Sequence, residues 1–319
     1  MIVTCPRDTP FLLLGARSMN WPVYLAHRKR VNVPKTAAPR VPKTKPKLGQ
    51  HFLNDPSAAM RIVEALGDVS QQTVLEIGPG RGVITTLLAR RTRRLIAIEL
   101  DRVLAAQLRM NLALSPNVEI IEGDILAMDF HTIFGPKPGS TRPGLTVAPE
   151  PARVIGNLPY YITSDILLRL FEYRQYFSTI VIMVQREVAD RITAAPGHSE
   201  YGMLSATAQL YANVEKLFTL PPDAFSPPPK VHSTVIRLTI APKLDRLDVP
   251  EAPFIDFLKL SFAQKRKTLW NNLKGNYDDA QLKNALAQAK VKPTARAETL
   301  SLAQSAAIYR ALRDAQSEP

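Results

Sequence analysis

The sequence has one cysteine, Cys5, among its 319 residues. No disulfide can form within the chain, which fits a reducing compartment. The five histidines are scattered and have no metal-ligand spacing, so we expect no metal site. No apolar run approaches the roughly 20 residues that a membrane-spanning helix needs, so we expect no membrane partner.

Acidic residues are scarce beside basic ones: 28 Asp and Glu face 41 Lys and Arg, which gives a formal net charge of +13. This balance favours a polyanionic partner, because each cation that neutralises a phosphate releases a counterion. The alternative is a solvated basic surface without such a partner. The excess is uneven, since residues 1–47 hold ten of the basic residues and a single acid, Asp8.

Residues 1–46 are expected to form a disordered basic arm, because prolines alternate there with Lys and Arg and little apolar surface is available. Three interpretations stay open: an organelle transit peptide, an RNA-binding arm, or a segment upstream of a true start at Met19. We expect a cytoplasmic, bacterial-type location, with an organelle matrix as the alternative if the arm is a transit peptide.

From Gln72 onward the sequence alternates between apolar strands and helical segments. Strands are predicted at 73–77, 95–100, 118–121, 153–156 and 179–184, with helices at 83–90 and 102–114. This alternation predicts an α/β fold, with a parallel sheet covered on both faces in a domain spanning 47–241.

The pattern of apolar and polar residues changes after residue 241. Further helices are predicted at 254–273, 278–289 and 302–312, so we expect a small all-α domain over 242–319. Residues 135–151, rich in Pro and Gly, are expected to form a surface loop.

The predicted strand ends carry residues suited to a nucleoside ligand. The first strand runs into E-I-G-P-G-R-G at 76–82, where Gly78 and Gly80 let the backbone approach a ligand closely. A dinucleotide site would prefer a glycine at the position of Val83. Glu99 ends the second strand and is placed to accept hydrogen bonds from ribose hydroxyls. Asp124 ends the third and can accept one from an adenine amino group.

Each of these features has a simpler explanation alone: a tight strand-to-helix turn for the glycines, and a solvated loop residue or helix cap for each carboxylate. Three consecutive strand ends that supply Gly, Glu and Asp favour a common ligand.

The fourth predicted strand ends in G-N-L-P-Y-Y, residues 156–161. The exocyclic nitrogen of adenine is a poor nucleophile, because its lone pair is delocalised into the ring. The Asn157 side chain and the Leu158 carbonyl could each accept one amino hydrogen and favour the tetrahedral nitrogen of the transition state. Pro159 stiffens the loop, and Tyr160 offers a face on which a flipped base can stack. The alternative is a strand-ending turn with a buried tyrosine.

These motifs together resemble the small-subunit ribosomal RNA adenine dimethyltransferases, over roughly residues 47–312. L-G-Q-H-F-L at 48–53, the stretches V-L-E-I-G-P-G-R-G, I-E-L-D and E-G-D, and N-L-P-Y-Y match motifs of that family. The resemblance implies a Rossmann-like class I methyltransferase sheet followed by a small all-α domain. It also implies S-adenosylmethionine as methyl donor, with His51 and Leu53 in contact with it and Asn157 close to it.

Two further stretches carry the resemblance. P-P-D-A-F-S-P-P-P-K-V-H-S at 221–233 places Phe225 on the other face of the target base, and F-A-Q-K-R-K-T-L-W-N-N-L at 262–273 resembles the basic helix of the helical domain. The implied reaction transfers four methyl groups to two adjacent adenosines near the 3′ end of small-subunit ribosomal RNA. The implied partner is an immature small ribosomal subunit, and we expect the protein to act as a monomer.

Three other functions remain open. A large-subunit ribosomal RNA adenine methyltransferase of the antibiotic-resistance type shares the glycine loop and the N-L-P-Y loop. A nucleic-acid-binding assembly or transcription factor without catalysis is a second alternative, which intact Glu99, Asp124 and Asn157 disfavour. A DNA adenine methyltransferase is disfavoured because no separate base-reading domain is evident.

Overall fold

The computed structural model of the protein describes residues 51–135, 150–159 and 161–317. The expected basic arm, Tyr160 and residues 136–149 of the expected surface loop lie outside these ranges. Lys47–Pro319 form one compact unit. The boundary expected near residue 241 therefore stays a prediction.

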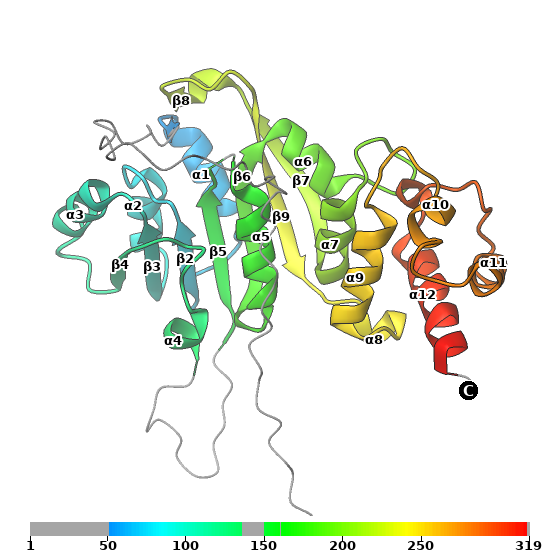
Figure 1. Cartoon of the computed structure of the whole chain (residues 1–319). Coiled ribbons are helices and arrows are strands. Elements are labelled where there is room, and N and C mark those ends of the chain that lie inside the picture. Colours follow the sequence, from blue (N-terminus) through cyan, green and yellow to red (C-terminus); the bar gives the residue numbers. More distant parts are fainter. Residues whose placement is uncertain (1–50, 136–149, 160, 318–319) are drawn as a thin grey trace, which may run out of the picture. The chain divides into compact units, whose positions relative to one another are not determined.

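A mixed seven-stranded sheet forms the centre of this unit, in the strand order β4-β3-β2-β5-β6-β9-β7 (Figure 1). Strands β2 to β6 pair in parallel, and β9 pairs antiparallel to both β6 and β7. The strands are β2 (Thr73–Ile77), β3 (Arg94–Glu99), β4 (Val118–Glu122), β5 (Ala152–Asn157), β6 (Phe177–Gln185), β7 (Ala212–Leu220) and β9 (Ser233–Ile240). The five parallel strands are those predicted, and the α/β methyltransferase-type fold is confirmed.

Strands β7 and β9 were not predicted. The sequence of β7, A-N-V-E-K-L-F-T-L, mixes polar and apolar residues, and its pairing with β9 shifts register between Lys216 and Phe218. An irregular strand of this kind shows no clean alternation with a period of two, which is the signal by which a half-buried strand is found. β9, by contrast, has the sequence S-T-V-I-R-L-T-I, a β-branched run that could have identified it as a strand.

Helices cover the sheet and continue beyond β7. They are α1 (Pro56–Glu64), α2 (Val83–Ala89), α3 (Arg102–Asn111), α4 (Phe130–Phe134), α5 (Thr163–Glu172), α6 (Arg186–Thr193), α7 (Met203–Tyr211), α8 (Leu244–Leu247), α9 (Glu251–Ser261), α10 (Leu269–Leu273), α11 (Asp279–Gln288) and α12 (Leu302–Ser317). On one face, Val74 and Ile155 of the sheet pack with Ile62 and Val63 of α1. Each such buried side chain contributes about 1.5–3 kcal/mol. None of the helices in the described ranges has the length and hydropathy of a membrane span.

The helix predicted over 254–273 is two helices. α9 ends at Ser261, and Thr268 begins α10 by accepting a hydrogen bond on its hydroxyl from the Asn271 amide, 3.3 Å away. Thr is a favoured N-cap residue, and the polar run before it offers no apolar face to pack. The basic residues Lys265–Lys267 therefore lie in a turn rather than on a helix.

A shared carboxylate connects α9 to the end of α7 and to the short 3-10 turn before β6. Glu251 of α9 accepts a hydrogen bond from the Tyr211 hydroxyl at 2.8 Å and forms an ion pair with Arg174 at 2.8 Å. Burial raises the pKa of Tyr211, with a further contribution from Glu251. Farther along, Phe254 and Phe257 of α9 pack against the ring of Tyr309 in α12.

Candidate functional site

A pocket opens where the parallel strands end. The chain runs outward from β2 through β3 to β4 and then returns to β5 on the other side of β2. Open α/β sheets bind ligands at such a reversal of strand order. Eight residues predicted from the sequence line this pocket: His51, Gly78, Gly80, Glu99, Asp124, Asn157, Leu158 and Pro159.

The glycine loop after β2 requires glycine at two of these positions. Gly78 and Gly80 have φ angles of +65° and +56°, which side chains rarely adopt. A Cβ on Gly80 would also lie 3.0 Å from the ring of Phe52. The Gly80 amide donates a hydrogen bond to Oε2 of Glu99, 2.9 Å away, so this loop is tied to the end of β3.

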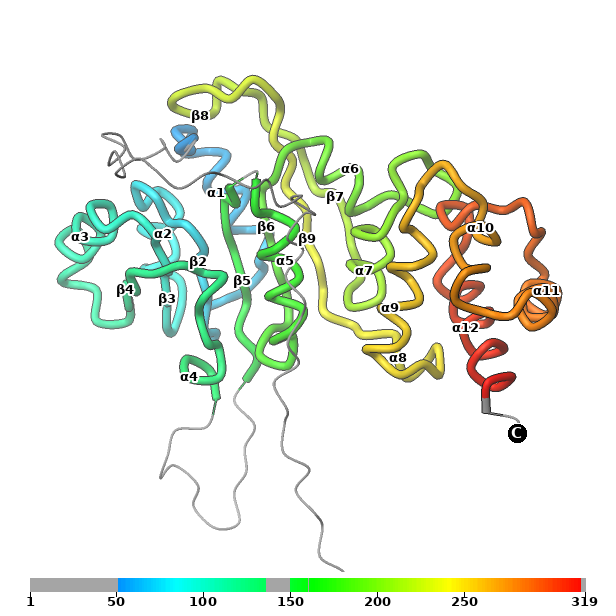
Figure 2. Tube along the Cα trace, in the orientation of Figure 1, coloured from blue at the N-terminus to red at the C-terminus, as the bar shows by residue number. Residues whose placement is uncertain are grey.

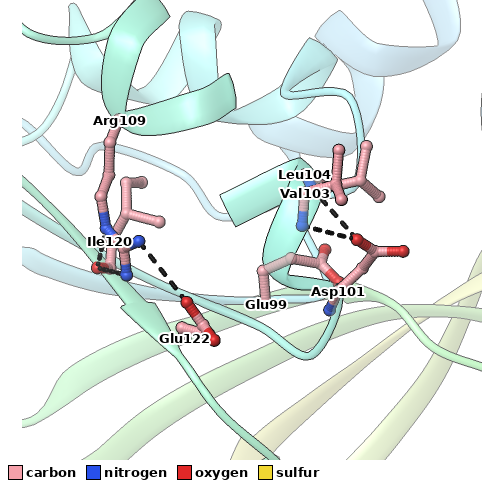
Figure 3. Close-up of polar contacts among 7 residues, drawn as sticks. All are labelled: Glu99, Asp101, Val103, Leu104, Arg109, Ile120 and Glu122. Carbon is pink, nitrogen blue, oxygen red and sulfur yellow. Dashed lines mark hydrogen bonds and ion pairs between the residues drawn. The ribbon is translucent and has the colours of Figure 1, made fainter. Parts of the chain in front are cut away.

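Glu99 is 4% exposed and has a partner for each carboxylate oxygen. Oε2 accepts from Gly80, and Oε1 accepts from the Asp101 amide at 2.9 Å. These bonds fix the orientation of a carboxylate that lines the pocket, and each oxygen has a second lone pair for a ligand hydroxyl. Asp101 instead caps α3, because its side chain accepts hydrogen bonds from the backbone amides of Val103 and Leu104 (Figure 3).

Asp124 lies just beyond β4 and is exposed at the pocket wall. One of its carboxylate oxygens accepts a hydrogen bond from the Leu126 amide at 2.9 Å, which holds the side chain in a turn. The carboxylate therefore has both the local role of a turn residue and a place in the pocket.

The loop after β5 brings the first residue of N-L-P-Y into the same pocket. The Asn157 amide nitrogen donates to the backbone carbonyl of His51 at 3.0 Å, so the amide is oriented by a segment 106 residues away in the sequence. The Leu158 amide donates to the Met183 carbonyl of β6, and its side chain is buried. Tyr160 lies outside the described residues, so its predicted stacking role stays a prediction.

A short two-stranded ribbon covers this end of the sheet (Figure 2). It pairs β1 (Phe52–Leu53) with β8 (Phe225–Ser226), and Leu53 lies opposite Phe225. A ring nitrogen of His51 lies 2.8 Å from the Pro227 carbonyl, which anchors the entry to this ribbon. The ribbon explains how His51 reaches Asn157.

Leu53 and Phe225 do not line the main pocket. Leu53 is 7% exposed and Phe225 is 3% exposed, and both side chains pack in the core beside α1. Leu53 lines only a smaller adjoining cavity. The predicted contacts of Leu53 with the donor and of Phe225 with the base stay predictions, and in the described conformation Phe225 presents no free face to a base.

Several pocket residues were missed by the sequence analysis. Phe52 lies beneath the guanidinium of Arg81, 4.5 Å from it, and forms one wall. Leu100 and Tyr161 are exposed apolar side chains at the pocket, and Tyr161 is 66% exposed. Glu76 faces the smaller adjoining cavity. An isolated acid inside the apolar strand T-V-L-E-I was a signal that could have identified Glu76.

The arrangement suits a nucleoside derivative beside an amide acceptor. The glycine loop offers backbone for close approach, Glu99 offers lone pairs to hydroxyls, and Asn157 lies beside Gly78 in the same pocket. Within the described residues, no group of three or more His, Cys, Asp and Glu could hold a metal ion.

Comparison with known proteins identifies related sequences over most of the chain. Residues 41–314 match the ribosomal RNA adenine dimethylase family. A ribosomal RNA small subunit methyltransferase A from Koribacter versatilis is 56% identical over 283 residues, covering 88% of this chain and 99% of that protein. A protein of the same name from Acidobacterium capsulatum is 52% identical over 273 residues, covering 85% of this chain and 92% of that protein.

Two solved structures are similar along nearly their whole length. A dimethyladenosine transferase from Plasmodium falciparum has a TM-score of 0.65 and 25% identity, covering 81% of this chain and 96% of that one. The 23S rRNA methyltransferase ErmE has a TM-score of 0.62 and 27% identity, covering 82% of this chain and 99% of that one.

Proposed function

Because the chain belongs to the ribosomal RNA adenine dimethylase family, we propose that it dimethylates two adjacent adenosines near the 3′ end of small-subunit ribosomal RNA during ribosome biogenesis. The observation that carries this proposal is a single pocket shared by the glycine loop, Glu99 and Asn157. A donor and an acceptor amine must meet within one cavity for direct methyl transfer. The glycine loop and Glu99 suit the donor, and Asn157 suits the acceptor amine.

S-adenosylmethionine supplies a methyl group activated by its sulfonium when it is bound. The described residues fit this donor: Gly78 and Gly80 line the pocket without side chains of their own, and Glu99 holds lone pairs toward the ribose position. Asp124 is exposed at the pocket wall, where it can accept a hydrogen bond from the adenine amino group of the donor. His51 closes the pocket from the ribbon side.

Asn157 and Leu158 act on the acceptor. The Asn157 side chain already donates through its nitrogen to His51, which directs its oxygen to the opposite side. That oxygen and the Leu158 carbonyl each accept one hydrogen of the target amine and favour the tetrahedral nitrogen that attacks the methyl group. Pro159 stiffens the loop, and Tyr160 stacks on the flipped base. No strong base is needed, because the amine proton becomes acidic once the methyl group has moved.

The small-subunit substrate is supported by the names of the two bacterial relatives, which are more than 50% identical to this chain. The alternative substrate is large-subunit ribosomal RNA, since the similar structure of ErmE is that of a 23S rRNA methyltransferase at 27% identity. We favour small-subunit RNA because the relatives named for the small subunit are more similar in sequence to this chain than ErmE is. We further propose that the enzyme acts as a monomer, in the cytoplasm, on an immature small subunit.

The test is made in cells that lack this chain. Ribosomal RNA of each subunit is digested and its nucleosides are analysed by mass spectrometry. Dimethyladenosine should disappear from small-subunit RNA, return when the chain is supplied, and stay absent when Asn157→Ala is supplied. Loss of dimethyladenosine from large-subunit RNA alone would show that large-subunit RNA is the substrate. No change in the dimethyladenosine of either RNA would refute the proposal.

A further inference from the structure

A cluster of arginines occupies the turn between α2 and β3. Residues 90–94 have the sequence R-R-T-R-R, and Arg90, Arg91 and Arg93 are exposed to solvent. We call residues 90–93 the arginine turn. It lies at the end of β3 opposite to Glu99, roughly 17 Å away along the strand, so it is not part of the pocket.

Neighbouring groups hold the backbone of the arginine turn in place. The side-chain amide of Asn117, just before β4, donates to the carbonyls of Ala89 and Thr92 at 2.9 Å each. Thr92 is 8% exposed, and its hydroxyl donates to the Leu88 carbonyl at 3.0 Å. The backbone amide of Arg91 donates to the same carbonyl at 2.9 Å. The direction in which the exposed side chains leave this turn is therefore set by the fold.

The fold makes little use of the three exposed charges. Basic side chains near the end of a helix often stabilise it by bonding to its last carbonyls, but two of these carbonyls are already bonded to Asn117 and Thr92. The three exposed arginines form no ion pair within the described ranges, whereas the adjoining Arg94 pairs with Glu119 at 2.8 Å. Like charges this close in the sequence repel one another, so a folding role does not explain the cluster.

The residue type indicates which partner would use these charges. All four basic residues of the cluster are arginines, whose planar guanidinium presents several donors that match the oxygens of a phosphate. The guanidinium of Arg91 lies 3.0 Å from Sδ of Met60 on α1. A thioether is a weak acceptor, so this contact orients the guanidinium and leaves its charge unneutralised.

We propose that the arginine turn binds the phosphate backbone of a second segment of the ribosomal RNA, separate from the segment that enters the pocket. This inference rests on the proposed ribosomal RNA substrate. Charge complementarity carries it, because three exposed guanidinium groups on a fixed turn belong to a chain of net charge +13 whose proposed substrate is a polyanion. Since the turn lies a strand length from the pocket, it holds the particle and takes no part in the methyl-transfer step.

The test compares the binding of immature small subunits by the full chain and by a variant that combines Arg90→Gln, Arg91→Gln and Arg93→Gln. The triple variant should bind at least about tenfold more weakly at 0.1 M salt. The dependence of log affinity on log salt should become less steep by about two to three, because each phosphate contact contributes about 0.7–0.9. The rate of single-turnover methyl transfer at saturating subunits should not change, because the pocket is untouched.

Matched variants separate a phosphate contact from a general effect of charge. The corresponding triple substitution to lysine keeps the charges and should keep the salt dependence. Arg93→Gln alone should lower the slope by about one. Lys216→Gln makes the same change in net charge on β7, at the opposite edge of the sheet, where the lysine pairs with Asp190 at 2.5 Å. This control should leave the slope unchanged.

Protection of the RNA backbone from hydroxyl radicals identifies what the turn binds. The unmodified chain should protect a segment besides the one around the target adenosines, and the triple glutamine variant should lose that protection alone. Unchanged affinity and salt slope in this variant, or slower methyl transfer at saturation, would overturn the proposal. Weaker binding without any lost protection would indicate a protein partner and would overturn it as well.

Two further outcomes are distinguishable from these. If the unmodified chain neither binds nor methylates the subunits, the proposed function on which the inference rests is refuted instead. Thermal unfolding checks that the variants are folded, which is expected because the substituted side chains are exposed. If the triple variant does not fold, the three single substitutions decide, since each should lower the salt slope by about one.

Discussion

The donor side and the base side of the pocket are built differently. The donor side consists of consecutive strand ends joined by local hydrogen bonds, such as the one from Gly80 to Glu99. The base side combines Asn157 and the segment around Phe225, which are far apart in the sequence and are connected through His51 and the β1–β8 ribbon. The donor side is complete within the sheet. The base side has an oriented amide, whereas Phe225 is buried and Tyr161 is exposed.

The largest expected effect is on the base side. Asn157→Ala removes one preorganised acceptor and should slow both methyl transfers by roughly 10²-fold, by analogy with the loss of one oxyanion-hole contact. Donor affinity should change far less, because Glu99 and the glycine loop remain. The measurement is single-turnover methyl transfer to immature small subunits. Asn213→Ala, an exposed asparagine on β7, is the control. Full activity in Asn157→Ala would refute the role of the amide.

The next effect is on the donor side. Glu99→Ala should weaken the binding of S-adenosylmethionine by at least tenfold, because the ribose loses its acceptors and the Gly80 amide loses its partner. Calorimetry checks this, with Glu122→Ala at the exposed end of β4 as control. Unchanged affinity in Glu99→Ala would show that Glu99 does not bind the donor, and the donor side would then not be formed by consecutive strand ends.

Glu76 should make the stability of the protein depend on pH. Glu76 in the empty protein keeps its proton up to a pKa of about 8, whereas unfolding returns it to its ordinary value of 4.5. Between these values the unfolded chain binds fewer protons, so the free energy of unfolding should fall as pH rises, by up to about 1.4 kcal/mol per unit.

Denaturant unfolding of the donor-free chain between pH 5 and pH 8 measures this slope. Glu76→Gln should lose the downward contribution. A slope that is the same in Glu76→Gln would show that Glu76 is ionised in the empty protein, as a carboxylate with satisfied partners would be.

The smallest effect is expected from the N-terminal segment. Deletion of residues 1–46 should leave the melting temperature within a few degrees, because its composition cannot form a packed core. The loss of up to nine Lys and Arg side chains could weaken RNA binding at low salt. Thermal unfolding and RNA binding at two salt concentrations separate these outcomes, and a large fall in melting temperature would show that the segment is part of the fold.

The sequence predicted the donor side well because its signals are local. The parallel strands showed as short apolar runs, and Gly80, Glu99 and Asp124 each stand directly at the end of one. Since parallel strands end at one sheet edge, strand order alone brings these residues together. The pocket lining confirms that they are neighbours, while their roles toward a ligand remain proposals.

The base side could not be derived in the same way. The hydrogen bond from Asn157 to the His51 carbonyl joins segments 106 residues apart, and no periodicity of apolar residues in the sequence predicts it. Whether Phe225 is buried depends on how β8 pairs with β1, which is a tertiary outcome. Glu76 was overlooked because a charged residue inside a strand is read first as an interruption, although burial without a partner is often a mark of a functional group.

The most direct measurement is methyl transfer by the purified chain to immature small ribosomal subunits, with S-adenosylmethionine as donor and mass spectrometry of the digested RNA. The account predicts four methyl groups per particle, present as two adjacent dimethyladenosines near the 3′ end, and almost none with Asn157→Ala. Methylated cytosine or guanine, or dimethyladenosine formed only when large-subunit RNA is supplied, would contradict it.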